Sequence, residues 1–260
     1  MVNSIIKAAR IVRFFLDQQR DLHFDEIYEF SGEKKSTLYN ILQTLQHVGY
    51  IQRNQHGKYQ LGIIFISLGA ACRRNFPLFS ITHPKLQEIM NKTNEVVFFG
   101  VLSGFEIIHV DSVYPTVEHT WGVETSAAEI GARSPLYCTG LGKATLAFLS
   151  PSHQKQYLEN VELKAFTNNT ITDPAKLMEE LELTKARGYA IDDRERNNRT
   201  FCYGIPVFQA NNEVLGAISL SGDDLMEKDR NEMVSILADC ANTISGLLGS
   251  NIKIRSDLSL

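Results

Sequence analysis

The clearest structural signal in the chain is Asp25–Leu61, which reads DEIYEFSGEKKSTLYNILQTLQHVGYIQRNQHGKYQL. It predicts a short helix, a tight turn, a longer helix and a β-hairpin. Apolar residues of the longer helix recur three and four positions apart and predict one buried face: Leu38, Ile41, Leu42, Leu45 and Val48. Ser31-Gly32 ends the preceding helix, because glycine tolerates the left-handed backbone that a helix stop needs.

The hairpin follows as two short strands, Tyr50–Arg53 and Lys58–Leu61, joined across Asn54–Gly57. A helix-turn-helix with a basic hairpin is a winged helix, which predicts DNA binding. The other face of the longer helix carries side chains that can donate to phosphates or bond base edges: Lys35, Ser36, Tyr39, Asn40 and Gln43. The same pattern also suits an ordinary α+β core fragment, so a second observation is needed to favour DNA binding.

The distribution of charge supplies that observation. Residues 34–87 contain no Asp or Glu, and residues 1–75 hold 10 Lys and Arg against 6 Asp and Glu. The first 75 residues therefore carry +4, whereas the whole chain carries −4. A basic module on an acidic body is typical of a phosphate-binding head joined to a partner domain.

Length and composition limit the number of domains and the class of protein. The chain has 260 residues, 43% of them hydrophobic, which suits two domains of about 75 and 180 residues. Its apolar runs are far shorter than the roughly 20 residues of a membrane span, and no signal peptide is apparent. The four cysteines are scattered without the spacing of a metal finger, so we expect a reduced cytoplasmic protein that has no membrane partner.

Two apolar helical patterns flank the winged helix. Ser4–Leu16 has an apolar stripe of Ile5, Ala8, Ala9, Val12, Phe15 and Leu16. This stripe predicts a plain core helix, a contact between two DNA-binding heads, or both. Leu61–Arg74 predicts a linker helix too apolar for an exposed tether, so it should pack against something such as a second subunit.

The remainder predicts helices packed on an antiparallel sheet, an α+β domain. Expected strands are Val96–Leu102, Glu106–Val113, Val117–Val123, Tyr189–Asp192, Phe201–Phe208 and Val214–Ser221. Expected helices are Ile81–Asn91, Gly140–Leu149, Pro151–Asn160, Asp173–Gly188 and Glu227–Leu248, with Ser250–Leu260 as a frayed tail.

Short motifs carry a resemblance to a known family. In the head they are Lys35-Ser36-Thr37, Gly49-Tyr50-Ile51 and Tyr59-Gln60-Leu61-Gly62. In the body they are Pro135-Leu136-Tyr137, Gly140-Leu141-Gly142-Lys143-Ala144, Gly188–Asp193 (GYAIDD), Cys202–Val207 (CYGIPV) and Ala217–Gly222 (AISLSG). In this order and at these separations, they resemble the IclR family of transcriptional regulators over essentially the whole chain.

That resemblance implies a winged helix-turn-helix domain in residues 1–62, a linker helix in 63–76, a GAF-like α+β effector-binding domain in 77–250 and a tail in 251–260. It implies a homodimer or homotetramer on double-stranded DNA, and we expect a pseudo-palindromic operator. Two departures concern specificity. Asn40 stands where the family often has Arg, and Asn197-Asn198-Arg199 with Phe201 replaces a loop that is usually Glu-Pro-Gly.

The DNA surface is predicted from these residues. We expect Thr37, Tyr39 and Asn40 to approach base edges, and Lys35, Ser36, Arg53 and Lys58 to meet phosphates. Lys34 and Gln43 complete the surface.

An effector site is predicted in the body. The side-chain period of two puts Ala217, Ser219 and Ser221 on one face of their strand. Gly140 begins a helix, whose free N–H groups and positive dipole end favour a carboxylate. The resemblance adds Asp192 and Cys202 to Ser219 and Ser221 as positions that contact small acids, with Gly140 supplying backbone. A charged Asp192 would repel a second carboxylate, which favours a 2-oxo or hydroxy acid, including a sugar acid.

Two patterns are set aside. Gly140–Thr145 looks like a P-loop, but Tyr137 replaces its first Gly and Ala144 its Ser or Thr, so no nucleotide is expected. His109 and Asp111 would share one strand face, yet two ligands make no metal site, and a satisfied histidine is the better interpretation. We expect no metal and no cofactor.

We expect a ligand-responsive repressor of a catabolic operon that senses a small organic or sugar acid. The alternative is an enzyme acting on a small carboxylate, with the winged helix serving only oligomerisation. No catalytic set of carboxylates, Ser/His/Asp or metal ligands supports it, so the chain is predicted not to be an enzyme.

Overall fold

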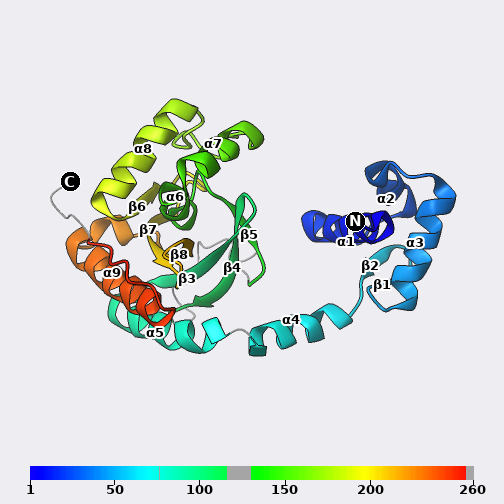
Figure 1. The fold of residues 1–260 in the computed structure, drawn as a ribbon, viewed down its shortest axis with the longest axis horizontal. Helices are drawn as coiled ribbons and strands as arrows, with labels where there is room; N and C mark the ends of the chain where they lie inside the picture. The colour runs from blue at the N-terminus through cyan, green and yellow to red at the C-terminus, as the bar shows by residue number, and fades with distance from the viewer. Residues whose placement is uncertain (76, 116–129, 256–260) are drawn as a thin grey trace. The chain divides into compact units, whose positions relative to one another are not determined.

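The computed structural model describes residues 1–75, 77–115 and 130–255, and it divides into two compact units, Met1–Phe76 and Pro77–Leu260 (Figure 1). Of the helices that it describes, none combines the length and the hydropathy that a bilayer span requires.

The N-terminal unit is a helix-turn-helix with a two-stranded wing. Its elements are α1 (Asn3–Gln18), α2 (Phe24–Ser31), α3 (Lys35–His47), β1 (Ile51–Arg53), β2 (Tyr59–Leu61) and α4 (Ile64–Asn75). Gly32 ends α2 with a φ of 66°, and Gly57 turns the hairpin with a φ of 74°, so glycine stands where the backbone is left-handed. Leu22 pairs with Tyr59 through two backbone hydrogen bonds of 2.9 and 2.8 Å, which adds a third extended segment to the wing.

The core of this unit differs from the predicted stripes at two places. Val48 is exposed because α3 ends at His47, so the residue lies past the helical period. In α1 the buried side chains are Ile11 and Phe15, whereas Ile5 and Leu16 are exposed. The stripe that meets α2 and α3 is therefore rotated from the predicted one, and it leaves apolar surface at both ends of α1.

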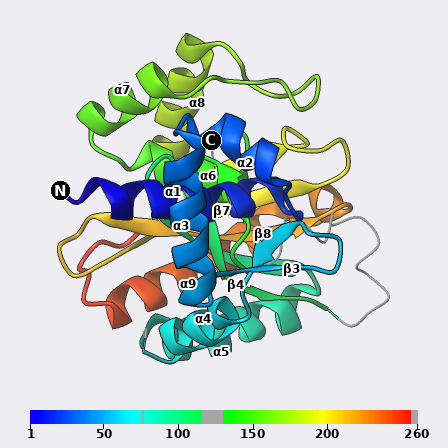
Figure 2. The ribbon, with the colours of Figure 1, turned by 90° about the vertical axis from the view of Figure 1, so that its right-hand side faces the viewer.

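The described part of the C-terminal unit is a six-stranded antiparallel sheet between two layers of helices. Its elements are α5 (Pro77–Thr93), β3 (Val96–Ser103), β4 (Glu106–Val113), β5 (Arg133–Pro135), α6 (Gly140–Ala147), α7 (Pro151–Asn160), α8 (Pro174–Arg187), β6 (Ala190–Asp193), β7 (Phe201–Phe208), β8 (Val214–Gly222), a short 3-10 helix (Leu225–Glu227) and α9 (Arg230–Leu247). The strand order is β5-β4-β3-β8-β7-β6. Figures 1 and 2 show α5 and α9 covering one face of the sheet, while α6, α7 and α8 cover the other.

Strand β8 shows how alternation builds the two layers. Ile218 and Leu220 belong to the apolar core on the side of α5 and α9, whereas Ala217 belongs to the core on the side of α6. Ser219 and Ser221 follow Ala217 at a spacing of two, so the predicted sharing of one face is confirmed.

Local signals also fix α8. Asp173 caps the helix by accepting hydrogen bonds from the N–H groups of Ala175 (2.8 Å) and Lys176 (3.1 Å). Gly188 ends it with a φ of 83°.

A β-bulge overturns one expectation about β4. Its pairing with β3 shifts between Phe99 and Gly100, so His109 lies opposite Gly100 while Asp111 lies opposite Phe99. Asp111 then bonds His83 of α5 at 3.0 Å, whereas His109 turns to the side of α6 and bonds Ser134. The two residues do not share a face, because the extra residue of the bulge reverses the alternation.

Other expectations for the C-terminal unit changed. Helix α5 begins at Pro77, four residues before the predicted start at Ile81, and contains Pro84 in its interior. The predicted strand Val117–Val123 lies outside the described residues. The start of the tail is held in place, because the side chain of Asn242 exchanges two hydrogen bonds with the backbone of Ile254 at 2.9 and 2.8 Å.

Candidate functional site

A cavity of about 90 Å³ lies between the sheet and the start of α6. All five residues predicted for the effector site line it: Gly140, Asp192, Cys202, Ser219 and Ser221. They come from α6, β6, β7 and β8, so the pairing of the sheet and the packing of α6 bring them together. Eight further lining residues were not predicted: Phe98, His109, Ser134, Thr139, Leu141, Arg196, Asn197 and Thr200.

The N-terminus of α6 forms one wall. The Thr139 side chain caps the helix by accepting a hydrogen bond of 3.0 Å from the N–H of Gly142. The N–H groups of Gly140 and Leu141 precede it, and the first N–H groups of a helix have no partner within the helix. They are therefore available to an anion at the cavity wall.

A glycine in β7 lets α6 approach the sheet this closely. A Cβ atom on Gly204 would lie 2.1 Å from the carbonyl oxygen of Gly140, which is a prohibitive overlap of backbone and side chain. A residue with a side chain would push the helix start away from β7, so Gly204 sets the width of the site.

The sheet contributes neutral hydrogen-bonding groups. Ser221 Oγ donates to Cys202 Sγ at 3.1 Å, and the register places these two residues opposite each other on β8 and β7. Burial raises the pKa of the Cys202 thiol well above its ordinary value, so the group is a neutral thiol. It is therefore a hydrogen-bonding group and not a thiolate nucleophile.

Asp192 is the titratable group of the cavity. Burial raises the pKa of its carboxyl from 3.8 to about 7, and the carboxylate of Glu195 acts in the same direction. The N–H of Glu195, which donates to Asp192 Oδ1 at 2.8 Å, and the ammonium of Lys143 oppose the rise. The sequence argument took Asp192 as charged, whereas a pKa raised to about 7 leaves both protonation states populated near neutral pH, and the protonated form can donate a hydrogen bond.

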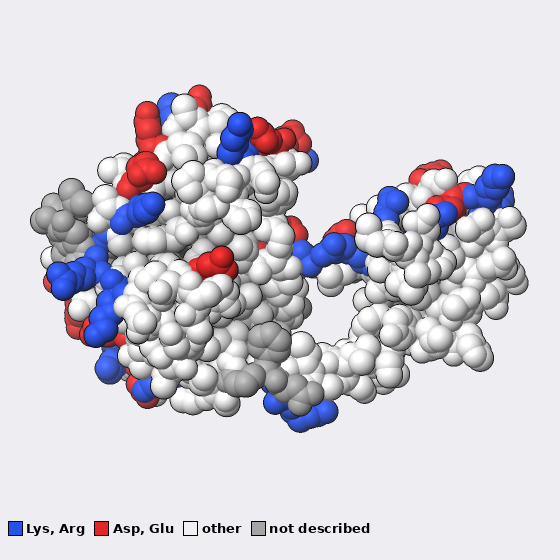
Figure 3. All heavy atoms as spheres, viewed as in Figure 1, with Lys and Arg blue, Asp and Glu red and all other residues white. Residues whose placement is uncertain are grey.

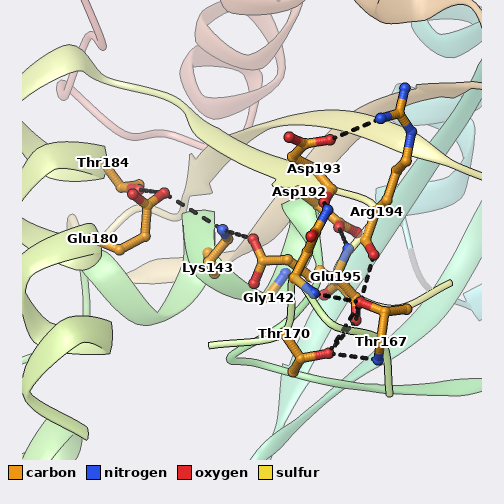
Figure 4. A network of polar contacts seen from close by, with 12 residues as sticks. Gly142, Lys143, Thr167, Thr170, Glu180, Thr184, Asp192, Asp193, Arg194 and Glu195 are labelled. Atoms are coloured by element: carbon orange, nitrogen blue, oxygen red, sulfur yellow. Dashed lines mark hydrogen bonds and ion pairs between the residues drawn. The ribbon is translucent and has the colours of Figure 1, made fainter. Parts of the chain in front are cut away.

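A buried ion network links α6 to the loop that follows Asp192 (Figure 4). Lys143 of α6 pairs with Glu195 and, at 3.4 Å, with Glu180 of α8. The hydroxyl groups of Thr167 and Thr170 donate to backbone carbonyls of the loop after β6, Thr170 to that of Glu195 at 2.6 Å. Lys143 is thus engaged within the protein, which agrees with rejecting the P-loop interpretation.

Three of the unpredicted residues, His109, Ser134 and Arg196, add polar groups to the cavity. His109 lies on β4 and bonds Ser134 of β5, a strand that the sequence did not predict. Arg196 follows Glu195, and its guanidinium lies 4.0 Å from the ring centroid of Phe166. The unusual loop around Asn197 was a signal for this region, whereas no pattern indicated that the bulge turns His109 inward.

The predicted DNA surface centres on α3 in the N-terminal unit. Lys34, Lys35, Ser36, Tyr39, Asn40 and Gln43 are exposed, and Thr37 is half-buried beside them. In Figure 3 most of the visible face of this unit is uncharged, and its charged side chains gather at the margins. The wing adds Lys58, which is half-buried, and Arg53.

Arg53 has a second role that the sequence did not indicate. Its guanidinium donates to Tyr59 Oη at 2.5 Å and lies 4.6 Å from the ring centroid of that buried residue. The side chain therefore braces the two strands of the wing.

The described residues contain no group of three or more His, Cys, Asp or Glu side chains that could hold a metal ion. The polar groups of the cavity are instead suited to reversible binding of a small acid through hydrogen bonds and the start of α6.

Comparison with known proteins gives two family matches. The family described as "Bacterial transcriptional regulator IclR C-terminal" matches residues 71–246, and the "IclR helix-turn-helix domain" matches residues 4–55. These families comprise transcriptional regulators and not enzymes.

Similar full-length proteins are known. The HTH-type transcriptional regulator KdgR of Escherichia coli is 31% identical over 254 residues, which covers 95% of this chain and 93% of that protein. The DNA-binding transcriptional repressor YiaJ of the same organism is 30% identical over 260 residues, covering 98% and 90%. The crystal structure of the Thermotoga maritima IclR superposes with a TM-score of 0.68 at 32% identity, covering 95% of this chain and 99% of that one.

Proposed function

The chain belongs to the IclR family of bacterial transcriptional regulators, and from this membership we propose that it represses a catabolic operon and responds to a small organic or sugar acid. Its helix-turn-helix is the DNA-binding domain. The repressor role is supported by YiaJ, a similar protein that is named a transcriptional repressor.

The DNA-reading surface in this proposal is α3 with the wing. Thr37, Tyr39 and Asn40 approach base edges from the exposed face of the helix. Lys34, Lys35, Ser36, Arg53 and Lys58 meet phosphates, and Gln43 extends the contact along the helix. This division is testable, since phosphate contacts act on all sequences alike whereas base contacts set preference.

Assembly as a homodimer or homotetramer is part of the proposal. Exposed apolar side chains lie on α1 (Ile5 and Leu16) and on α4 (Ile66 and Leu68), and Ile66 retains 72% of its exposure. Apolar surface of this kind is costly to leave in water, so it favours a second subunit. Two heads related by a two-fold axis would read a pseudo-palindromic operator.

The observation that carries the effector proposal is the convergence of five residues from four strands and helices on one cavity beside a helix N-terminus. The acid's carboxylate lies at Gly140 and Leu141, and Ser219 and Ser221 bond its remaining oxygens. Cys202 and Asp192 close the polar edge. In this proposal the protein has one conformation whose heads fit the operator and one whose heads do not. An acid that binds the second conformation more tightly would shift the protein toward it and release DNA.

Two measurements test the proposal on the full chain. Fluorescence anisotropy with DNA flanking its own coding region should show binding that weakens steeply with salt. A thermal-shift screen of small organic and sugar acids should raise the unfolding temperature for the effector class. Absence of salt-dependent binding to that DNA would refute the operator assignment.

Calorimetry of Ser219→Ala then tests the site. Loss of one hydroxyl partner should weaken acid binding by roughly 1–3 kcal/mol, because a bound polar group loses its hydrogen bond. The fold should persist, since the change is small and removes no apolar packing. Equal affinity in wild type and Ser219→Ala, for an acid that alters DNA binding, would place the effector elsewhere.

A further inference from the structure

A second polar group lies across the cavity from the proposed carboxylate site. His109 Nε2 and Ser134 Oγ are 2.8 Å apart, and both residues line the cavity. His109 retains only 6% of its exposure and Ser134 only 7%, so the pair is buried. It belongs to β4 and β5, whereas the proposed carboxylate site belongs to α6 and β8.

Phe98 of β3 separates the two polar groups. Its register partner on β8 is Ser219, and its ring lies edge-on to that of His109 with centroids 5.3 Å apart. Because neighbouring strands are about 4.8 Å apart, β8 and β4 are separated by roughly 9.6 Å across β3. An acid of two or three carbons cannot reach both groups.

The pair has hydrogen-bonding capacity that the protein does not use. Among the described residues His109 Nδ1 has no hydrogen-bond partner, and the Ser134 hydroxyl makes only the bond to His109. A hydroxyl can donate once and accept twice. Buried polar atoms are normally paired, and each exception calls for a physical explanation.

His109 is neutral in this environment. Burial lowers the pKa of its imidazole to about 4, so at neutral pH the ring carries one N–H donor and one acceptor nitrogen. A neutral pair of this kind suits a hydroxyl or carbonyl group, and it offers no charge to a second carboxylate.

We propose that His109 and Ser134 are specificity-determining residues that bond a hydroxyl or carbonyl remote from the effector's carboxylate. The effector class is then a hydroxylated acid of more than three carbons, such as a sugar acid, whose carbon chain crosses Phe98. This inference rests on the proposed acid site at α6 and narrows its ligand; it adds a contact that the five predicted residues do not make.

Calorimetric titration of the full chain with three probes tests it. Gluconate carries remote hydroxyls, hexanoate has the same number of carbons without hydroxyls, and lactate has only the hydroxyl next to its carboxylate. The wild type should bind gluconate more tightly than either of the others. His109→Leu and Ser134→Ala should each lower the preference for gluconate over lactate about tenfold, which is the expected scale for one lost hydrogen bond.

Matched variants separate the two proposals. His109→Gln keeps a donor and an acceptor and should restore part of the preference, whereas Ser112→Ala, a serine of β4 outside the cavity lining, should leave it unchanged. Ser219→Ala should weaken gluconate and lactate alike, because it acts at the carboxylate end.

Each outcome is decisive. If lactate and gluconate bind and Ser219→Ala weakens both, but His109→Leu and Ser134→Ala keep the wild-type preference, the second polar contact is refuted and the acid site stands. The contact is equally refuted if the wild type binds gluconate no better than lactate or hexanoate. If the wild type binds none of the acids, or Ser219→Ala weakens neither, the acid site itself fails, and this inference fails with it.

Discussion

Acid binding should weaken as the pH rises from 6 to 8. The reason lies in Asp192, whose pKa burial raises to about 7, so that its protonated form is common in the middle of this range. Protonated Asp192 can donate a hydrogen bond to an anionic effector, whereas ionised Asp192 repels it. The groups around it are Glu195, Lys143 and the backbone N–H of Arg196, with Cys202 as a neutral thiol.

The size of the effect follows from the pKa. With a pKa of about 7, the protonated fraction is about nine-tenths at pH 6, half at pH 7 and one-tenth at pH 8. If only the protonated form binds, the apparent affinity scales with that fraction. The Kd for an acid such as lactate should therefore rise about tenfold between pH 6 and pH 8, with uptake of about half a proton at pH 7.

Calorimetry at these three pH values, in buffers of different ionisation enthalpy, measures both the affinity and the proton uptake. Asp192→Asn is the matched control, because an amide keeps a hydrogen-bond donor that does not titrate. Its affinity should be independent of pH over this range. A flat profile in the wild type, or the same slope in Asp192→Asn, would refute this role for Asp192.

Asp192→Asn should also change the stability of the protein. Folding raises the pKa of the Asp192 carboxyl from 3.8 to about 7, which favours folding below about pH 4, and this contribution is lost as the pH rises through 7. Asp192→Asn should therefore gain stability relative to wild type from pH 4 to pH 8 by thermal unfolding, and a loss over that range would contradict the pKa. In anisotropy titrations, Lys58→Ala should weaken binding to all DNA sequences alike and lower the slope of log affinity against log salt by about one; an unchanged slope would refute the wing contact. Changing Asn40 should instead cost about 1–3 kcal/mol of binding free energy at one base position. Lys143→Met leaves Glu195 buried without its partner and should cost about 3–5 kcal/mol in denaturant unfolding, while Lys164→Met, at an exposed pair, should cost little; equal effects would contradict the role of burial. Light scattering at micromolar concentration should give at least a dimer, and a monomer that persists with operator DNA would refute the assembly.

Much of the fold was predictable because its signals are local. The period of Leu38 to Leu45, the left-handed turn at Gly32 and the cap at Asp173 each depend on a few neighbouring residues. The alternation of β8 likewise placed Ser219 and Ser221 on one face without knowledge of their neighbours. The remaining members of the predicted site, Asp192 and Cys202, came from resemblance to the family.

Local patterns therefore gave the kind and order of most elements, and which side chains share a face wherever the strand or helix is regular. The pairing of distant segments is what turns His109 at the bulge in β4 and brings Ser134 of β5 beside it. Tertiary packing also decided the pKa of Asp192, because the loss of water around a carboxyl depends on what packs over it. Pairing register and desolvation are set by contacts between residues far apart in the chain, and no local pattern records them.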